Sequence, residues 1–229
     1  MKVVILAAGA GSRLGNQDLP KPLTLLSHGQ SILEMQLSHL SQYISLNDVF
    51  IVVGFHKEQI VNKFPNMHFI ENPEYASENT SKSLLKAIKN VDDDVLWING
   101  DVVFNPFILE KILKADRSSM IVNVSDVDDE GVKYWTNDEG QILEVSKEVK
   151  QPYGEALGIN FFIKEELPAL KKNLEQCKKN DYFEKAIEMC IQQGIAVWSI
   201  PVKGSDCTEV DFPEDLKKAN ELLKLWSKN

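Results

Sequence analysis

Apolar and polar positions follow two patterns along the chain. Short runs of consecutive apolar residues occur at 3–7, 49–53, 68–70, 95–98 and 120–124, and they predict buried strands. Between them, apolar positions recur every three or four residues at 32–40, after Ser31 as a helix cap, and at 57–64, 81–88 and 106–113. Strands that are apolar on both faces and are each followed by a helix predict a parallel sheet covered on both sides. The expected fold is therefore a doubly wound, mostly parallel α/β fold.

The pattern changes after residue 125. Two strand-like stretches, 131–136 and 141–146, flank the sequence Asn137-Asp138-Glu139-Gly140, a strong hairpin-turn signal. Further strands are expected at 157–162 and 196–200, and helices at 164–174, 183–193 and 213–226. No Pro-, Gly- or Ser-rich linker divides the chain. We therefore expect one domain, 1–229, with a small inserted antiparallel β lobe.

The composition narrows the classes of protein. The 229 residues carry a formal net charge of −9, which argues against a nucleic-acid groove but not against a phosphorylated substrate. Three scattered cysteines fit a reducing compartment without disulfides. The first apolar run is too short for a targeting segment, and no stretch approaches the roughly 18 apolar residues that span a bilayer. These observations predict a cytoplasmic protein that is not inserted in a membrane.

A glycine-rich loop follows the first strand directly. Gly9 and Gly11 allow backbone N–H groups to approach an anion closely, and Arg13 adds a cation suited to phosphate oxygens. Lys21 follows between two prolines that stiffen its backbone. The spacing matches neither the dinucleotide fingerprint nor the P-loop. A fixed cation beside an anion-binding loop predicts a triphosphate site, although a glycine turn without chemistry remains the alternative.

Two aspartates are candidate metal ligands. Asp101 follows Asn99-Gly100 at the carboxyl end of a buried strand, where ligands bind in open α/β sheets. Asp211 precedes the last helix. Carboxylates at these places can hold a hard cation such as Mg²⁺. The alternatives are a turn residue for Asp101 and a helix N-cap for Asp211.

The stretch 6–14 with Pro20-Lys21-Pro22-Leu23 resembles the opening of the sugar-1-phosphate and choline-phosphate nucleotidyltransferases. The resemblance covers nearly the whole chain, to about residue 222, and is weaker in the middle. It implies a nucleotide-binding half at about 1–125 and an acceptor-binding half at about 126–229. It also implies joint Mg²⁺ ligation by Asp101 and Asp211, and catalytic roles for these two residues, Arg13 and Lys21. We interpret Glu209 and Asp215 as ordinary acids at the start of the last helix. The residues assigned to the nucleotide are Leu6, Ala7, Ala8, Gly9, Ala10, Gly11, Ser12, Arg13, Lys21, Gly54, Asn79, Ser83, Asn99 and Gly100.

The choice of nucleotide depends on the segment 75–84, which resembles the Asn…Ser-Leu segment of choline-phosphate cytidylyltransferases. In that group the segment lies near the pyrimidine, and Asn79 can both donate and accept hydrogen bonds toward a base edge. CTP is therefore expected ahead of UTP or dTTP. A helix cap for Asn79 and a small packing residue for Ser83 are the alternatives.

Four residues are assigned to the acceptor. The resemblance gives Lys147 a contact with the acceptor phosphate, Glu155 a contact with an amine or hydroxyl, and Gly158 a close approach of the acceptor to the backbone. Trp135, with neighbouring aromatic residues, could form a cage around a quaternary ammonium. A solvated lysine and a cross-strand packing tryptophan are the alternatives. Phosphocholine, a phosphonate, a phosphorylated amino acid and a sugar or alditol phosphate all stay open as acceptors.

The expected function is a Mg²⁺-dependent cytidylyltransferase that transfers CMP from CTP to a small phosphorylated or phosphonate acceptor. The resemblance implies surface-polysaccharide or lipid-headgroup synthesis as its setting. A second reading is a sugar-1-phosphate nucleotidylyltransferase that uses UTP or dTTP, which loses weight because no proline follows Lys147-Glu148. A third reading is a nucleotide-binding protein without catalysis.

Overall fold

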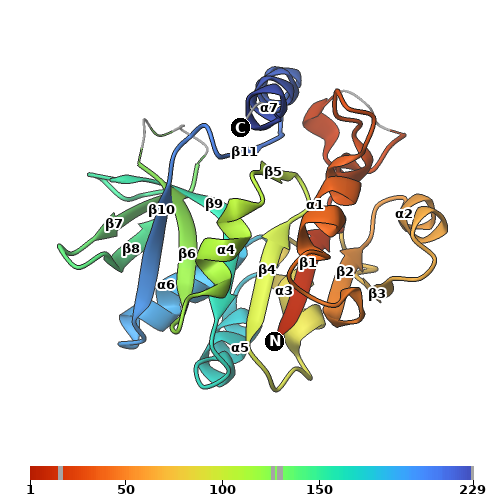
Figure 1. Cartoon of the computed structure of the whole chain (residues 1–229). Helices are drawn as coiled ribbons and strands as arrows, with labels where there is room; N and C mark the ends of the chain where they lie inside the picture. Colours follow the sequence, from red (N-terminus) through yellow and green to blue (C-terminus); the bar gives the residue numbers. More distant parts are fainter. Residues whose placement is uncertain (15–17, 125–126, 128–130, 228–229) are drawn as a thin grey trace.

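In the computed structural model the described residues are 1–14, 18–124, 127 and 131–227, without the side chain of Ser12. Their centre is a nine-stranded sheet in the order β3-β2-β1-β4-β9-β6-β10-β8-β7 (Figure 1). Its strands are β1 (Lys2–Ala7), β2 (Val49–Val53), β3 (His68–Glu71), β4 (Val95–Asn99), β6 (Ser119–Asn123), β7 (Lys133–Thr136), β8 (Gln141–Ser146), β9 (Gly154–Phe162) and β10 (Val197–Val202). A separate small sheet pairs β5 (Val102–Phe104) with β11 (Cys207–Glu209).

Helices cover both faces of the large sheet. The α-helices are α1 (Ile32–Leu40), α2 (Lys57–Lys63), α3 (Thr80–Ile88), α4 (Phe107–Leu113), α5 (Leu167–Gln176), α6 (Phe183–Gln192) and α7 (Pro213–Trp226). Alternate residues of β1 enter two separate cores: Val3 and Ile5 pack with α1, α2, α4 and α7, whereas Val4 and Leu6 pack with α3, α5 and α6. Because β1 is apolar on both faces, it can only lie between two such layers, and the predicted α/β class is confirmed.

Strand direction divides the sheet into two parts. The pairings among β3, β2, β1 and β4 are all parallel. Strand β9 then runs antiparallel to both β4 and β6, while β10 is parallel to β6. The start of β9 consequently lies at the same edge of the sheet as the carboxyl ends of β1 and β4. This edge collects side chains from both halves of the chain.

The predicted hairpin forms as β7 and β8, but it is not detached from the main sheet. Strand β8 pairs with β10, and β7 pairs with β9. The lobe is therefore an extension of the nine-stranded sheet. Strands β5 and β11 were not predicted, because three residues are too few to show a periodic pattern.

Two composition-based expectations can be compared with the structure. Cys177, Cys190 and Cys207 are all buried and free. Among the described residues, no helix combines the length and the apolar character that crossing a membrane requires.

Candidate active site

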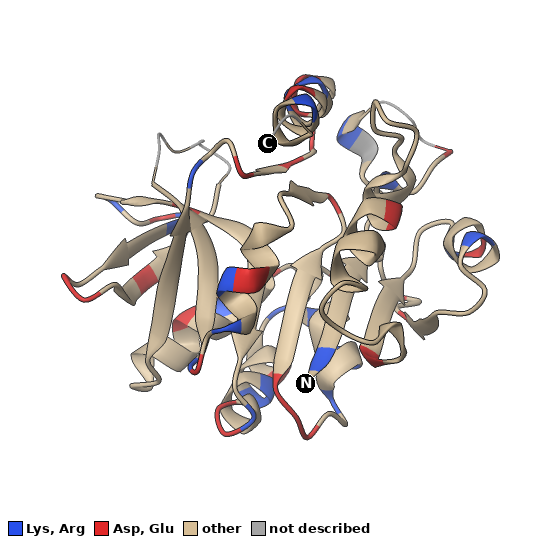
Figure 2. Ribbon diagram, in the orientation of Figure 1, with Lys and Arg blue, Asp and Glu red and all other residues tan. Residues whose placement is uncertain are grey.

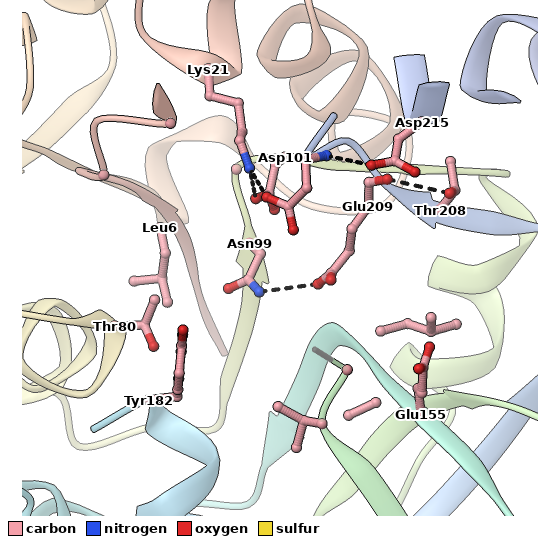
Figure 3. Close-up of a pocket in the computed structure, with 18 of the residues that line it drawn as sticks. Leu6, Lys21, Thr80, Asn99, Asp101, Glu155, Tyr182, Thr208, Glu209 and Asp215 are labelled. Atoms are coloured by element: carbon pink, nitrogen blue, oxygen red, sulfur yellow. Dashed lines mark hydrogen bonds and ion pairs between the residues drawn. The ribbon is translucent and has the colours of Figure 1, made fainter. Parts of the chain in front are cut away.

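A cavity of about 850 Å³ opens at the carboxyl edge of β1 and β4 (Figure 3). It lies between the two halves of the chain, because its walls include the glycine loop, the end of β4, the start of β9, the start of α6 and the segment from β11 to α7. Most residues expected at the site line this cavity. They are Leu6, Ala7, Gly9, Ala10, Gly11, Arg13, Lys21, Asn79, Asn99, Gly100, Asp101, Lys147, Glu155 and Asp211.

Lys21 joins the two predicted metal-binding aspartates. Its Nζ donates a hydrogen bond to Oδ2 of Asp101 at 2.8 Å and another to Oδ1 of Asp211. The lysine side chain is only 10% exposed, against 23% for Asp101 and 30% for Asp211. Burial lowers the pKa of Lys21, but the two carboxylates raise it by more, so its pKa lies above the ordinary 10.5 and the ammonium is charged.

Local backbone geometry explains why Lys21 points into the cavity. Pro20 (φ −55°) precedes the short 3₁₀ helix Lys21–Leu23, and Pro22 lies within it. Gly11 has φ +56°, and a Cβ atom placed there would come within 2.7 Å of Cβ of Lys21. Glycine is therefore favoured at position 11 for two reasons: the backbone is left-handed there, and the lysine side chain packs where a Cβ atom would lie.

Asp101 is held by the turn between β4 and β5. Gly100 N donates to the carbonyl of Leu6 at 2.9 Å, and a Cβ atom at Gly100 would collide with that same oxygen. The buried side chain of Gln36 donates to the carbonyls of Asn99 and Val102 on either side of the turn. The predicted turn is present, and it directs the carboxylate toward Lys21 rather than toward solvent.

The donor set around Asp101 fits a divalent cation. Its Oδ1 is buried and has no hydrogen-bond partner among the described residues, while Oδ2 binds Lys21. A buried carboxylate oxygen without a partner is costly unless a ligand or water completes it. Magnesium commonly binds one or two carboxylates and takes its remaining ligands from water and phosphate, and Asp101 with Asp211 supplies two.

Glu209 is not the ordinary acid at the start of the last helix that the sequence suggested. It belongs to β11, lines the cavity, and accepts a hydrogen bond from Nδ2 of Asn99 at 3.4 Å (Figure 3). Burial and then the charges of Asp101 and Asp211 raise the pKa of Glu209 to about 8. The structure thus adds a third carboxyl group beside the two aspartates.

Asp215 behaves as expected of an acid in the first helical turn. It accepts hydrogen bonds from the backbone N–H groups of Asp211 and Phe212, at 3.0 and 2.8 Å. Arg13 approaches the same segment, with Nη2 3.9 Å from Oδ1 of Asp211 and the guanidinium 5.3 Å from the Phe212 ring centroid. The amino-terminal loop and the last helix therefore meet across the cavity.

Figure 2 shows acidic and basic residues interspersed along α7 and in the loops beside it.

On the acceptor side, two of the predicted residues lie outside the cavity lining. Trp135 does not line the cavity, because it stacks on Tyr153 with ring centroids 4.3 Å apart and so packs across strands. Gly158 has φ +65°, and a Cβ atom there would come within 2.6 Å of Nδ2 of Asn99 and 2.9 Å of Oε1 of Glu209. The glycine leaves room for these two side chains, and a close approach of the acceptor to its backbone stays a prediction.

Three nucleotide assignments also fall outside the cavity lining. Ser83 is buried and accepts a hydrogen bond from Asn72 at 3.0 Å. Gly54 packs against Tyr75 and the carbonyl of Ala8. The Ala8 carbonyl also accepts a hydrogen bond from the N–H of Phe55. Ala8 therefore ties the start of the glycine loop to the segment after β2. The assignment of the Ser12 side chain lies outside the described residues.

Asn79 is the helix cap that the sequence offered as an alternative, and its contact with the nucleotide stays a prediction. Its side chain accepts from the N–H of Thr80 at 2.8 Å as the N-cap of α3, and it also lines the cavity. Sequence reasoning missed Tyr182 and Glu184 at the start of α6, although both line the cavity. A helix start rich in polar residues was the only local signal, and it is shared by most helices.

The fold and the cavity define an α/β protein that presents a glycine-rich loop, a charged lysine and two aspartates bonded to it at one edge of its sheet. The chain belongs to the family described as the MobA-like NTP transferase domain, whose sequence pattern matches residues 3–179.

Several curated proteins are similar in sequence. A CMP-5'-(3-aminopropyl)phosphonate synthase of Streptomyces rubellomurinus is 36% identical over 53% of this chain and 20% of its own length. A bifunctional protein GlmU of Methanocaldococcus jannaschii is 28% identical over 97% of this chain and 54% of its own length. The chain thus spans a fifth and about half of these two relatives. A UTP–glucose-1-phosphate uridylyltransferase of Haloferax volcanii is 27% identical over 98% of this chain and 97% of its own length.

Two solved structures share the fold. The inositol-1-phosphate CTP transferase from T. maritima aligns with a TM-score of 0.82 and 19% identity, covering 100% of this chain and 96% of that one. The CTP:phosphocholine cytidylyltransferase from Streptococcus pneumoniae aligns with a TM-score of 0.78 and 20% identity, covering 97% and 98%.

Proposed function

We propose that this protein is a cytidylyltransferase, which transfers CMP from CTP to a small phosphorylated or phosphonate acceptor and releases pyrophosphate. The observation that carries this proposal is the Lys21 ammonium bound between Asp101 and Asp211 at the wall of one cavity. A cation and two carboxylates in contact are the elements needed to bind a triphosphate together with a divalent metal. The glycine loop borders the same cavity.

In the proposed reaction no covalent bond to the protein forms. An oxygen of the acceptor phosphate or phosphonate attacks the α-phosphorus of CTP, and the bond from that phosphorus to the bridging oxygen breaks. Pyrophosphate leaves with the bonding electrons. Lys21 and Arg13 bind and neutralise phosphate oxygens, and Lys147, which lines the same cavity, holds the acceptor's anionic group. Mg²⁺, held by Asp101 and Asp211, would add electrostatic stabilisation of the phosphates.

CTP is proposed as the nucleotide because two kinds of comparison favour it. The Streptomyces relative is named for a CMP product, and both solved structures described above are CTP enzymes. Asn79 lies at the cavity wall, and its side-chain amide bonds to the N–H of Thr80 and the carbonyl of Asn180. A sugar-1-phosphate uridylyltransferase is the second candidate, because the Haloferax relative matches over nearly the full length of both chains.

Pyrophosphate release with each of CTP, UTP, dTTP, ATP and GTP tests the proposal. Each nucleotide is combined with phosphocholine, 2-aminoethylphosphonate, glycerol 3-phosphate and glucose 1-phosphate, in MgCl₂ and in EDTA. We expect release with CTP that EDTA abolishes. Release with UTP or dTTP and glucose 1-phosphate alone would replace the proposal by the second candidate. CTP binding without release for any acceptor would instead indicate a nucleotide-binding protein.

A further inference from the structure

The buried face of α1 carries one polar side chain among apolar ones. The buried residues of this helix are Ile32, Leu33, Met35, Gln36, Leu37 and Leu40. Gln36 is 0% exposed, and its Oε1 atom has no hydrogen-bond partner among the described residues. An apolar residue of similar size would avoid the desolvation of this amide oxygen, so packing alone does not explain a glutamine at this position.

The amide of Gln36 joins two backbone carbonyls on either side of Asp101. Its Nε2 atom donates one hydrogen bond to the carbonyl of Asn99 at 2.9 Å and another to the carbonyl of Val102 at 2.8 Å. A side-chain amide has two N–H donors, so both are used here. Helix α1 is thereby bonded to both ends of the turn that carries Asp101.

The carbonyl of Asp101 itself is bonded to the segment of the other aspartate. The N–H of Val210 donates to this carbonyl at 3.0 Å, and Val210 directly precedes Asp211. The backbone around Asp101 is therefore held by α1 on one side and by the segment after β11 on the other. The separation of the two carboxylates depends on these backbone contacts.

The 3₁₀ helix that carries Lys21 also rests on α1. The N–H of Ile32, the first residue of α1, donates to the carbonyl of Thr24, which ends the 3₁₀ helix, at 3.1 Å. In Figure 1 the same helix stands beside β5, the strand that follows the Asp101 turn, and the two elements are in contact. One helix therefore supports both partners of the Lys21–Asp101 hydrogen bond.

We propose that Gln36 is a positioning residue of the active site, which holds Asp101 where its carboxylate binds Mg²⁺. This inference rests on the proposed function. Gln36 is buried behind the turn, so it acts through the backbone of Asn99 and Val102 and not by touching substrate. Partners that orient metal ligands typically contribute about 10- to 100-fold to metal affinity or activity. A displacement of about 1 Å at a reacting site can lower the rate by a similar factor.

Gln36→Met and Gln36→Glu test this assignment. Methionine is also a good helix former of similar length but has no N–H donor, and glutamate keeps the shape with at most one donor. With α,β-methylene CTP present, the free Mn²⁺ signal in electron paramagnetic resonance gives the Kd for the metal. We expect this Kd to rise by about 10- to 100-fold in both variants. Pyrophosphate release should need correspondingly more MgCl₂, while KM for CTP at saturating MgCl₂ changes by less than about threefold.

Asn173→Leu is the matched control for the loss of a buried amide. Asn173 is 0% exposed, and its Nδ2 atom lies 3.2 Å from Sγ of Cys190 and 3.2 Å from Oε1 of Gln193. These contacts join α5 to α6 and its end, away from the Asp101 turn. The control should lower the melting temperature and leave the Kd for Mn²⁺ unchanged, which separates a loss of stability from a displacement of Asp101.

Two results would overturn the inference. An unchanged Kd for Mn²⁺ in folded Gln36 variants would mean that the two hydrogen bonds contribute to stability alone. An equal rise of this Kd in Asn173→Leu would mean that metal affinity follows stability and not the position of Asp101. Absence of pyrophosphate release by the unmodified protein with every nucleotide and acceptor would instead overturn the proposed function.

Hydrogen exchange in the unmodified protein remains decisive if neither Gln36 variant folds. MgCl₂ is added to the protein with α,β-methylene CTP already bound, so that only the metal-binding step is observed. Exchange of backbone amides should slow in 99–104 and in α1 together, because ordering of Asp101 stabilises the turn to which Gln36 bonds, and α5 should not change. Slower exchange in 99–104 without any change in α1 would contradict the inference.

Discussion

Replacing Lys21 by methionine separates the charge of this side chain from its packing. The lysine is 10% exposed and binds both Asp101 and Asp211. Methionine keeps an unbranched apolar stem of similar length but removes the ammonium. In Lys21→Met the two carboxylates would lose the ammonium that joins them, with Arg13 still 3.9 Å from Asp211, and the unpartnered Oδ1 of Asp101 would remain.

The expected loss of stability follows from the exposure of the three groups. Removing one partner of a fully buried ion pair costs about 3–5 kcal/mol, whereas fully exposed pairs contribute about 0–1 kcal/mol. The aspartates are 23% and 30% exposed, so water screens them in part. We expect a loss of about 1–3 kcal/mol and, for a domain of this size, a melting temperature lowered by about 2–12 °C.

Thermal unfolding followed by circular dichroism, at low salt with and without MgCl₂, measures this change. Mg²⁺ should raise the melting temperature of Lys21→Met more than that of the unmodified protein, because the cation replaces the missing charge beside the aspartates. Turnover should still fall by about 10²- to 10³-fold, since the preorganised charge at the phosphates is lost. Lys57→Met removes a lysine whose pair with Glu71 is exposed, and it should change neither quantity appreciably.

Two outcomes would refute this reasoning. If Lys21→Met melted at the same temperature as the unmodified protein in EDTA, the ion pairs would make no net contribution to stability. If Mg²⁺ stabilised both proteins equally, the lysine and the metal would not share the two aspartates.

Three further predictions concern the same cavity. Asp101→Asn and Asp211→Asn should each lower kcat for pyrophosphate release by about 100-fold or more, because each removes a proposed metal ligand. Their circular dichroism spectra should be unchanged. Near-normal turnover in both variants would contradict the proposed metal site. Gly11→Ala should lower kcat by at least about tenfold and reduce thermal stability, because its φ of +56° disfavours alanine and the new methyl group displaces Lys21; unchanged kinetics would show that the loop adapts. The pKa of Glu184 is about 7 in the folded protein against the ordinary 4.5. The neutral Glu184 side chain therefore stabilises the fold fully below pH 4.5, and this stabilisation is lost as the pH rises through 7. Glu184→Gln, which stays neutral, should therefore gain stability relative to the unmodified protein on the order of 2 kcal/mol between pH 5 and pH 8 in denaturant titrations; parallel pH curves would contradict the assignment.

Local patterns were sufficient for most of the secondary structure. The first strand is apolar at every position from Val3 to Ala7, and such a strand is stable only between two covering layers. The cap at Ser31, predicted from the sequence, is present, and Glu34 completes a capping box with it over a short range. The turn at Asn137–Gly140 likewise predicted the hairpin of β7 and β8.

Only the tertiary structure decided the direction of the strands and which distant segments come into contact. An apolar run does not reveal whether its neighbours are parallel, so the antiparallel course of β9 through the middle of the sheet could not be derived. That course brings the start of β9 to the cavity and places Gly158 against Asn99 and Glu209. Trp135 likewise stacks on Tyr153 because of cross-strand register, which the spacing of aromatic residues does not determine.

The features of the cavity, too, fall into those that the sequence predicted and those that only the fold decided. The sequence by itself predicted which residues carry its chemistry: the glycine loop, Lys21, Asp101 and Asp211 were assigned from local patterns and from the family resemblance. Only the fold decided that Lys21 bonds to a carboxylate 190 residues later. Only the fold, too, left Glu184 buried with an unpaired oxygen. Burial and pairing depend on groups from distant segments, and electrostatic free energies are set by those surroundings rather than by the local sequence.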